Sequence, residues 1–267
     1  MSRAPRLITR PKDTMPERDS SIRAVERAIT LLRALNQMPV STLDGLHQLT
    51  LLPKPTLIRL LRTFEELGLV ARGGRPGEYR LLEGVNALNS GYHHVPRVVE
   101  IAAPLVRALT EEIKWPIAVG MLDVDALVVR YSTIPYSPLS LLHSSINMRL
   151  SLVSRALGRA YLAFCAPEEQ AMLLEVVRQS HHPEDRLAQD REAVQTMIAQ
   201  TRERGYALRD TTVRPVSGTI AVPVMAKEFV AASIGLTWFS SALTVEKVVE
   251  RYLGQLQDVS RRISEQL

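Results

Sequence analysis

The sequence predicts an α+β multidomain protein, with a small N-terminal domain of helices and a β-hairpin followed by a larger α/β domain with a mainly antiparallel sheet. Three observations predict this. Apolar residues recur at helical spacing up to about residue 67, and two short strand-like runs then flank a Gly/Pro turn. Beyond about residue 98, strand and helix patterns interleave. The expected units are a flexible basic arm at 1–20, a module of helices and a hairpin at 21–82, a partly helical linker at 83–97 and an α/β domain at 98–267.

The positive charge of the chain is concentrated in its first third. Residues 1–82 contain 14 Lys/Arg and 8 Asp/Glu, a net charge of +6, whereas the remaining residues contain 19 and 20, a net charge of −1. This asymmetry fits a polyanionic partner for the N-terminal part. A basic solvated arm explains some of it, since Arg3, Arg6, Arg10 and Lys12 precede the first helix. The helix pattern therefore carries more weight than the charge.

Nothing in the sequence indicates a secreted, membrane or metal-binding protein. The N-terminal residues lack the apolar segment of a signal peptide, and no run of about 18 apolar residues could cross a membrane. Cys165 is the only cysteine, which excludes an internal disulfide and a cysteine-based zinc site. We expect a cytoplasmic protein in which Cys165 is a small buried side chain rather than a catalytic thiol.

The first helix is expected from Ile22 to Met38. Ser21 is its N-cap, and Pro39 ends it. Its apolar positions recur in steps of three and four residues, which is the helical period. These positions are Val25, Ala28, Ile29, Leu32 and Leu35.

The next two helices are expected to form a helix-turn-helix. One spans 41–48 with Thr42 as its N-cap, and the other runs from Lys54 to Leu67, where Gly68 ends it. Leu51 occupies part of the connector, which usually contains glycine. The inward-facing residues are Leu43, Leu46 and Leu49 in the first of these helices and Leu57, Leu60, Leu61, Phe64 and Leu67 in the second. In this motif the later helix lies in the major groove of DNA.

The outward face of that later helix contains the candidate DNA contacts. Lys54, Thr56 and Arg59 are expected to meet base edges, with Pro55 among them, and Arg62 is expected to meet a phosphate. The alternative is that the two arginines only solvate a helix surface.

A basic β-hairpin follows. Leu69–Arg72 and Glu78–Leu82 read as strands on either side of a Gly/Pro turn at 73–77. Arg72, Arg75 and Arg80 lie at its tip and edges, where they suit the phosphate backbone or the minor groove. Three helices, a basic outward face and a basic hairpin together predict a winged helix-turn-helix.

The segment LPKPTLIRLLRTFEELGLV at 52–70 resembles the IclR family of bacterial transcription regulators. That family typically has Leu-Pro-Lys-Ser-Thr-Val, then Arg-Leu-Leu, then Leu-Gly-Tyr/Leu-Val. Pro55 replaces the usual serine, which the first turn of a helix tolerates. Ala28 and Leu32 match the family's opening helix. The resemblance implies a ligand-responsive regulator that binds a double-stranded DNA operator and needs no cofactor.

The resemblance extends over the second domain. ALGRAYLA at 156–163 and SGTIAVPV at 217–224 are similar to family segments, although Ser151, Val153 and Arg155 replace the family's Pro, His and Thr. Within the family, the strings at 122–130 and 162–165 are most similar to the MhpR-like branch, activators of hydroxyphenylpropionate breakdown. This implies a GAF-like effector-binding domain, an operon for aromatic-acid catabolism, and a homodimer or dimer of dimers.

The elements of the second domain follow from its own residues. Helices are expected at 98–114, 156–163, 167–177, 191–205 and 244–265, and strands at 117–123, 126–132, 218–225 and 229–237. The residues expected on the buried side of the first helix are Val98, Ile101, Leu105, Ala108, Leu109 and Ile113. Asp123 and Asp125 resemble a paired-carboxylate site, but a hairpin turn explains them better.

No enzyme or metal motif stands out. The adjacent pairs His93-His94 and His181-His182 lack the spacing of metal ligands, and there is no phosphate loop, dinucleotide fingerprint or nucleophile–base arrangement. An enzyme with a fused DNA-binding module, or an adaptor that uses its winged helix to bind a partner protein, remains an alternative. Turnover of candidate acids identifies the enzyme, and weak dependence of DNA binding on salt identifies the adaptor.

The resemblance also implies where an effector binds, between the helix at 156–163 and the last two strands. The positions carried over are Leu150, Gly158, Ser217, Thr219, Gly235 and Thr237. Small and hydroxyl side chains leave space and offer hydrogen bonds, although ordinary strand packing explains them equally well. An aromatic carboxylic acid also needs a cation, for which Arg130, Arg155 and Arg209 are candidates.

Overall fold

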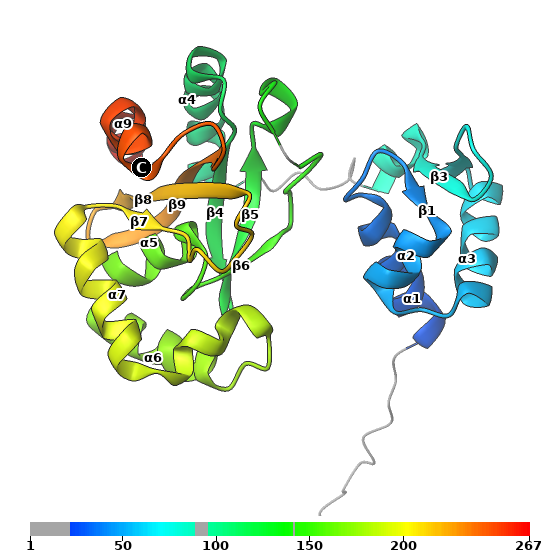
Figure 1. Ribbon diagram of the computed structural model, residues 1–267, viewed down its shortest axis with the longest axis horizontal. Coiled ribbons are helices and arrows are strands. Elements are labelled where there is room, and N and C mark those ends of the chain that lie inside the picture. The colour runs from blue at the N-terminus through cyan, green and yellow to red at the C-terminus, as the bar shows by residue number, and fades with distance from the viewer. Residues whose placement is uncertain (1–21, 89–95, 141) are drawn as a thin grey trace, which may run out of the picture.

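The computed structural model describes residues 22–88, 96–140 and 142–267, and confirms the predicted fold class (Figure 1). The N-terminal part contains α1 (Arg23–Leu35), β1 (Ser41–Thr42), α2 (Leu43–Thr50), α3 (Lys54–Glu66), β2 (Val70–Arg72) and β3 (Glu78–Leu81). Its three strands form an antiparallel sheet in the order β1-β3-β2. The winged helix-turn-helix therefore has a third strand, β1, which the sequence did not reveal because two residues are too few for a pattern. The basic arm, Ser21, His93 and His94 lie outside the described residues.

The buried face of α1 agrees with the prediction at Leu35, which is buried, and at Ala28 and Leu32, which pack against the core, but differs nearer the start of the helix. Val25 and Ile29 are 54% and 44% exposed, whereas Leu31, Ala34 and Leu35 are buried. The reason is that only the C-terminal turns of α1 reach the core formed with α2 and α3. The helix also ends at Leu35, before the predicted Met38.

Two other predicted core leucines are exposed because they lie at helix ends. Leu49 is in the last turn of α2 and is 54% exposed, and Leu67 caps α3 and is 65% exposed. Gly68 follows with a φ of 70°, the left-handed conformation that terminates the helix.

The second domain is built on a six-stranded antiparallel sheet in the order β6-β5-β4-β9-β8-β7. Its strands are β4 (Ile117–Asp123), β5 (Ala126–Ser132), β6 (Arg149–Ser151), β7 (Ala207–Leu208), β8 (Ser217–Ala226) and β9 (Phe229–Phe239). The β4–β5 hairpin has the bounds that the sequence predicts, and Val124 turns it with a φ of 60°. β6 and β7 are additional edge strands.

Helices cover both faces of this sheet (Figure 1). On one face lie α4 (Arg97–Ile113) and α9 (Gly254–Ser264), packed on side chains such as Ile220, Val222 and Ile234. On the other lie α5 (Ala156–Phe164), α6 (Pro167–Arg178) and α7 (Arg191–Arg204), packed around residues such as Leu127 and Ala221. Ile220, Ala221 and Val222 alternate between the two layers, which is the period of a strand.

Two helical elements depart from prediction. In α4 the predicted residues Val98, Leu109 and Ile113 are buried, whereas Ala108 is exposed. Val99, Ala102 and Val106 are buried in addition, because the helix also packs against α9. The C-terminal helix is interrupted: α8 (Val245–Val248) and α9 are joined by a π-helical turn at Val249–Leu253. The linker contains a 3₁₀ helix at Glu83–Leu88. No helix among the described residues is long and apolar enough to cross a membrane.

Candidate DNA-binding and ligand-binding sites

Local hydrogen bonds fix the helix-turn-helix. Thr42 caps α2 by accepting from the Gly45 amide at 3.1 Å. His47 Nδ1 lies 2.7 Å from the Leu52 carbonyl oxygen, and because a carbonyl only accepts, this nitrogen carries the proton. Leu51 has a φ of 56°, the conformation for which glycine is preferred, and is 83% exposed. These bonds hold the start of α3 at a fixed angle to α2.

The basic side chains of α3 lie on its exposed side. Lys54 and Arg59 are exposed, Thr56 is half-buried, and Arg62 is exposed one turn further along. Lys54 pairs with Asp44 at 2.7 Å, and the Lys54 ammonium, through this hydrogen bond and its charge, lowers the pKa of the Asp44 carboxyl. Such solvent-exposed ion pairs are weak, so a phosphate can replace the carboxylate.

The hairpin presents its arginines to solvent. Gly77 turns it with a φ of 80°, and the Arg75 amide donates to Glu78 Oε2 at 3.1 Å. Arg72 pairs with Glu65 at 3.1 Å. Across residues 22–88, no carboxylate pairs with the side chains of Arg59, Arg75 or Arg80.

Sequence reasoning did not single out Ile58. It lies on α3 beside Arg59 and is 49% exposed. An apolar side chain on a helix that enters the major groove can contact a thymine methyl group. The feature in the sequence that could have identified Ile58 is its position outside the apolar stripe of the helix.

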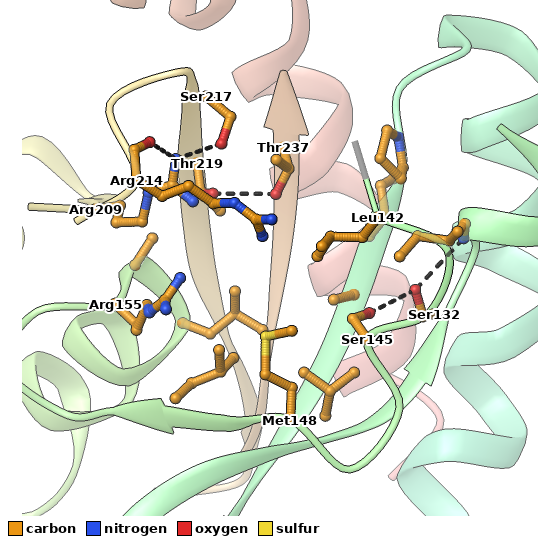
Figure 2. Close-up of a pocket in the computed structure, with 18 residues that line it drawn as sticks. Ser132, Leu142, Ser145, Met148, Arg155, Arg209, Arg214, Ser217, Thr219 and Thr237 are labelled. Atoms are coloured by element: carbon orange, nitrogen blue, oxygen red, sulfur yellow. Dashed lines mark hydrogen bonds between the residues drawn. The ribbon is translucent and has the colours of Figure 1, made fainter. Parts of the chain in front are cut away.

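The second domain contains a cavity of about 680 Å³, its open mouth included, on the α5 side of the sheet. Its walls come from β4, β5, β8 and β9, from the start of α5 and from the segment that joins β5 to β6 (Figure 2). Of the residues carried over from the family, Leu150, Ser217, Thr219 and Thr237 line it, as do the candidate cations Arg155 and Arg209. The first residues of α5, Ala156 and Leu157, lie in the cavity wall, so the positive end of the helix dipole is close to the cavity. No acidic residue in the first turn of α5 neutralises it.

One end of the cavity is polar and cationic. Arg155, Arg209 and Arg214 lie there together, beside the hydroxyls of Thr219 and Thr237 (Figure 2). These two hydroxyls are 3.0 Å apart and hydrogen-bonded to one another. Burial, and after it the charges of Arg155 and Arg214, lower the pKa of Arg209 to about 10. Burial is the largest cause of this shift, and the charges of the two neighbouring arginines add to it.

The rest of the wall is mostly apolar. The apolar residues are Pro116, Ile117, Ala118, Val129, Ile134, Leu142, Met148, Leu150, Ala156 and Leu157. At the side opposite the arginines, Ser145 donates to Ser132 at 2.9 Å (Figure 2). The cavity therefore offers a cationic end, an apolar middle and a small neutral polar group, which is suited to a small organic anion with an apolar body.

One candidate cation and two of the carried-over residues do not line the cavity. Arg130 forms an ion pair with Asp123 at 2.6 Å across the β4–β5 hairpin. A Cβ on Gly158 would lie only 2.1 Å from the Ser151 carbonyl oxygen, so this glycine allows α5 to approach β6. A Cβ on Gly235 would meet the Leu157 side chain at 2.4 Å. Both glycines thus pack the layer behind the cavity.

The cavity also has members that sequence reasoning missed. Arg214, Ser132, Ser145 and Leu142 lie on loops or at a strand end, where no periodicity marks them. Arg214 has a φ of 57° and precedes Pro215, so its backbone is strained. The only sequence signal was an arginine in the loop that leads to Ser217.

Other candidate chemistry has a structural explanation. Asp125 pairs with Arg149 at 2.8 Å, so the two turn aspartates bind separate arginines rather than forming one site. Cys165 is 3% exposed, and burial raises the pKa of its thiol to about 12. Within the described residues no group of His, Cys, Asp and Glu could hold a metal ion.

Comparison with known proteins agrees with this architecture. The IclR helix-turn-helix domain matches residues 24–74, and the C-terminal domain of bacterial transcriptional regulator IclR matches residues 91–265. The transcriptional regulator KdgR of Escherichia coli is 27% identical over 95% of each chain. The crystal structure of IclR from Thermotoga maritima superposes with a TM-score of 0.64 at 18% identity, covering 91% of this chain and 98% of that one. An IclR homologue from Microbacterium hydrocarbonoxydans in complex with 4-hydroxybenzoate gives a TM-score of 0.57 at 19% identity, covering 91% and 98%. This chain therefore belongs to the IclR family of DNA-binding bacterial transcriptional regulators.

Proposed function

We propose that this regulator responds to an aromatic carboxylic acid that binds in the cavity of the second domain, and that it controls an operon for aromatic-acid catabolism. The observation that carries the proposal is the pairing of a cationic end with an apolar wall. A sugar acid needs hydrogen-bonding partners along its whole length, and apolar residues would leave its hydroxyls unpaired at a cost of about 1–3 kcal/mol each. The complex of a family member with 4-hydroxybenzoate supports the same ligand class.

We propose that α3 and the hairpin contact the operator. Lys54, Thr56 and Arg59 are assigned to base edges, because the first turns of such a helix reach them. Arg62 is assigned to a phosphate, since it lies further along the helix. Pro55 shapes the first turn, and the arginines of the hairpin contact the backbone or the minor groove.

The proposed mechanism is thermodynamic linkage in a homodimer or dimer of dimers. A ligand that binds one arrangement of the oligomer more tightly shifts the population towards it. Residues 83–97 then set the spacing of two winged helices on a palindromic operator.

A thermal-shift screen of the full-length protein tests the ligand class. Benzoate, 4-hydroxybenzoate and 3-phenylpropionate are compared with their amides and with galacturonate. A ligand at 100 times its Kd stabilises the folded protein by about 2.7 kcal/mol. For a domain of this size that corresponds to a rise in Tm of about 5–10 °C. A rise with galacturonate but with none of the aromatic acids refutes the proposal.

A further inference from the structure

Three arginines line the cationic end of the cavity, but they differ in their partners. The Nε and Nη2 atoms of Arg155 donate to the two carboxylate oxygens of Glu184 at 2.8 and 2.5 Å. Both side chains are largely buried, with 17% and 22% exposed. Such a bidentate pair neutralises Arg155 and occupies its donors on that side.

Arg209 is occupied in another way. Its Nη2 donates to the Ser217 hydroxyl at 2.8 Å and to the carbonyl oxygen of Arg214 at 3.3 Å. The same carbonyl accepts from the Ser217 amide at 3.2 Å. Arg209 therefore holds the backbone of Arg214 from the side, and both of its partners are uncharged.

Arg214 is different from both. Within residues 96–140 and 142–267, its guanidinium makes no hydrogen bond or ion pair with the protein, yet it extends over the cavity towards Thr237 (Figure 2). Arg214 as a whole is exposed, but its guanidinium is partly buried, and this burial, with the charge of Arg155 after it, lowers the pKa of Arg214. Its left-handed φ of 57° is an unfavourable backbone conformation for an arginine that precedes proline. Other interactions of the loop therefore have to stabilise this backbone conformation, which places the side chain over the cavity.

We propose that Arg214 binds the carboxylate of the ligand, that Arg209 is a positioning residue for Arg214, and that Glu184 keeps Arg155 from taking that role. The assignment rests on the proposed function, because it presumes an organic acid in this cavity. Arg155 and Glu184 together carry no net charge, whereas no carboxylate among the described residues forms an ion pair with Arg209 or Arg214. A ligand carboxylate between Arg214 and the Thr219–Thr237 pair reduces the repulsion between Arg209 and Arg214. In that pair one hydroxyl donates to the other, so the acceptor's proton is free for the ligand.

Calorimetric titration of the full-length protein with benzoate and 3-phenylpropionate, and with their amides, tests the assignment. Arg214→Ala is expected to weaken binding of the acids tenfold or more and to leave the amides within twofold. Alanine has the same difficulty with a positive φ as arginine, so the loop keeps its strain. Arg130→Ala is the matched control, since Arg130 pairs with Asp123 outside the cavity. Arg130→Ala is expected to leave the affinities for the acids and for the amides unchanged.

A double-mutant cycle tests the positioning role of Arg209. In the wild-type background, Arg209→Ala is expected to weaken acid binding about as much as Arg214→Ala does. In the Arg214→Ala background, the same substitution is expected to weaken acid binding by less than a further threefold. A purely structural role predicts the same loss in both backgrounds. Glu184→Gln is expected to tighten acid binding severalfold, because Arg155 then loses its counterion.

The outcomes separate this assignment from the proposed function. Wild-type protein that binds none of the acids refutes both. Acids that bind the wild-type protein and the Arg214→Ala variant equally refute only the assignment, as does a variant that weakens amides as much as acids. Loss of acid binding in Arg155→Ala together with unchanged binding in Arg214→Ala assigns the carboxylate to Arg155 and overturns the proposal.

Discussion

Replacement of Gly158 by alanine tests whether this glycine provides space for packing or for a ligand. Gly158 lies in α5 directly over the chain at Ser151 and Leu152. An added Cβ would lie 2.1 Å from the Ser151 carbonyl oxygen and 2.7 Å from the Leu152 Cα. Both atoms belong to the backbone, so neither can move aside as a flexible side chain does. The helix has to shift away from β6 to accept the methyl group.

The expected cost follows from this geometry. Overpacking a well-filled core costs about 1–3 kcal/mol, and a backbone clash belongs at the upper end of that range. Alanine recovers up to about 1 kcal/mol through its better helix propensity. We therefore expect Gly158→Ala to lower the free energy of unfolding by about 2 kcal/mol, using the overpacking range above. In a domain of 150–250 residues this is a fall in Tm of about 4–8 °C.

Gly254 provides the matched control. It begins α9 with helical φ and ψ of −58° and −43°, and no neighbouring atom lies within 4 Å of the position that a Cβ would occupy. Gly254→Ala should therefore stabilise the domain by about 0.5–1 kcal/mol. Urea or thermal unfolding followed by tryptophan fluorescence measures both, because Trp115 and Trp238 are both buried in the second domain. If Gly158→Ala unfolds at or above the wild-type temperature but binds acids more weakly, Gly158 lines the ligand site and the packing argument is wrong.

Four further predictions concern other parts of the chain. Arg59→Ala should relax base preference at one operator position and cost about 1–3 kcal/mol, measured by competition binding with single-base operator variants; unchanged binding contradicts the assigned face of α3. Arg75→Ala should weaken all DNA sequences alike and reduce the slope of log K against log salt by about 1, and a sequence-dependent loss would contradict a phosphate contact. Leu51→Gly should be more stable than Leu51→Ala by about 1 kcal/mol in urea, since only glycine removes the strain of the left-handed turn. Because burial raises its pKa to about 12, the Cys165 thiol should react slowly with a disulfide reagent at pH 8 until urea unfolds the protein; rapid reaction in buffer would show that it is accessible.

The elements that the sequence predicts most accurately are those specified by their own residues. β4 and β5 have the predicted bounds because a short apolar run and a two-aspartate turn are both local features. The capping of α2 by Thr42 is equally local. The buried face of α1 was predicted correctly at Ala28, Leu32 and Leu35 but wrongly at Val25 and Ile29, which have helical spacing yet are exposed among the residues that the structure describes. Periodicity identifies a helix, whereas the neighbours that arrive in the fold determine which of its apolar residues are buried.

The candidate site depends even more on distant neighbours. Its cationic end joins Arg155 at the start of α5 to a loop more than fifty residues later, and sequence spacing gives no measure of that approach. The family resemblance correctly identified Ser217, Thr219 and Thr237 as cavity residues. They lie on the paired strands β8 and β9, where Thr219 faces Thr237. The resemblance gave no indication of Arg214, which lies on the loop before β8.

The availability of an arginine depends on its carboxylate partner, and that partner is set by the fold. Arg130 and Arg155 were equally plausible in the sequence, but Asp123 on the same hairpin binds one, and Glu184, 29 residues from Arg155, binds the other. In the sequence Glu184 is an unremarkable acid after a proline, yet its position removes one of three cations from competition for the ligand. A search for ligand-binding residues in this family should therefore examine which cations lack an internal counterion, because proximity to the cavity alone selects Arg155 and Arg214 equally.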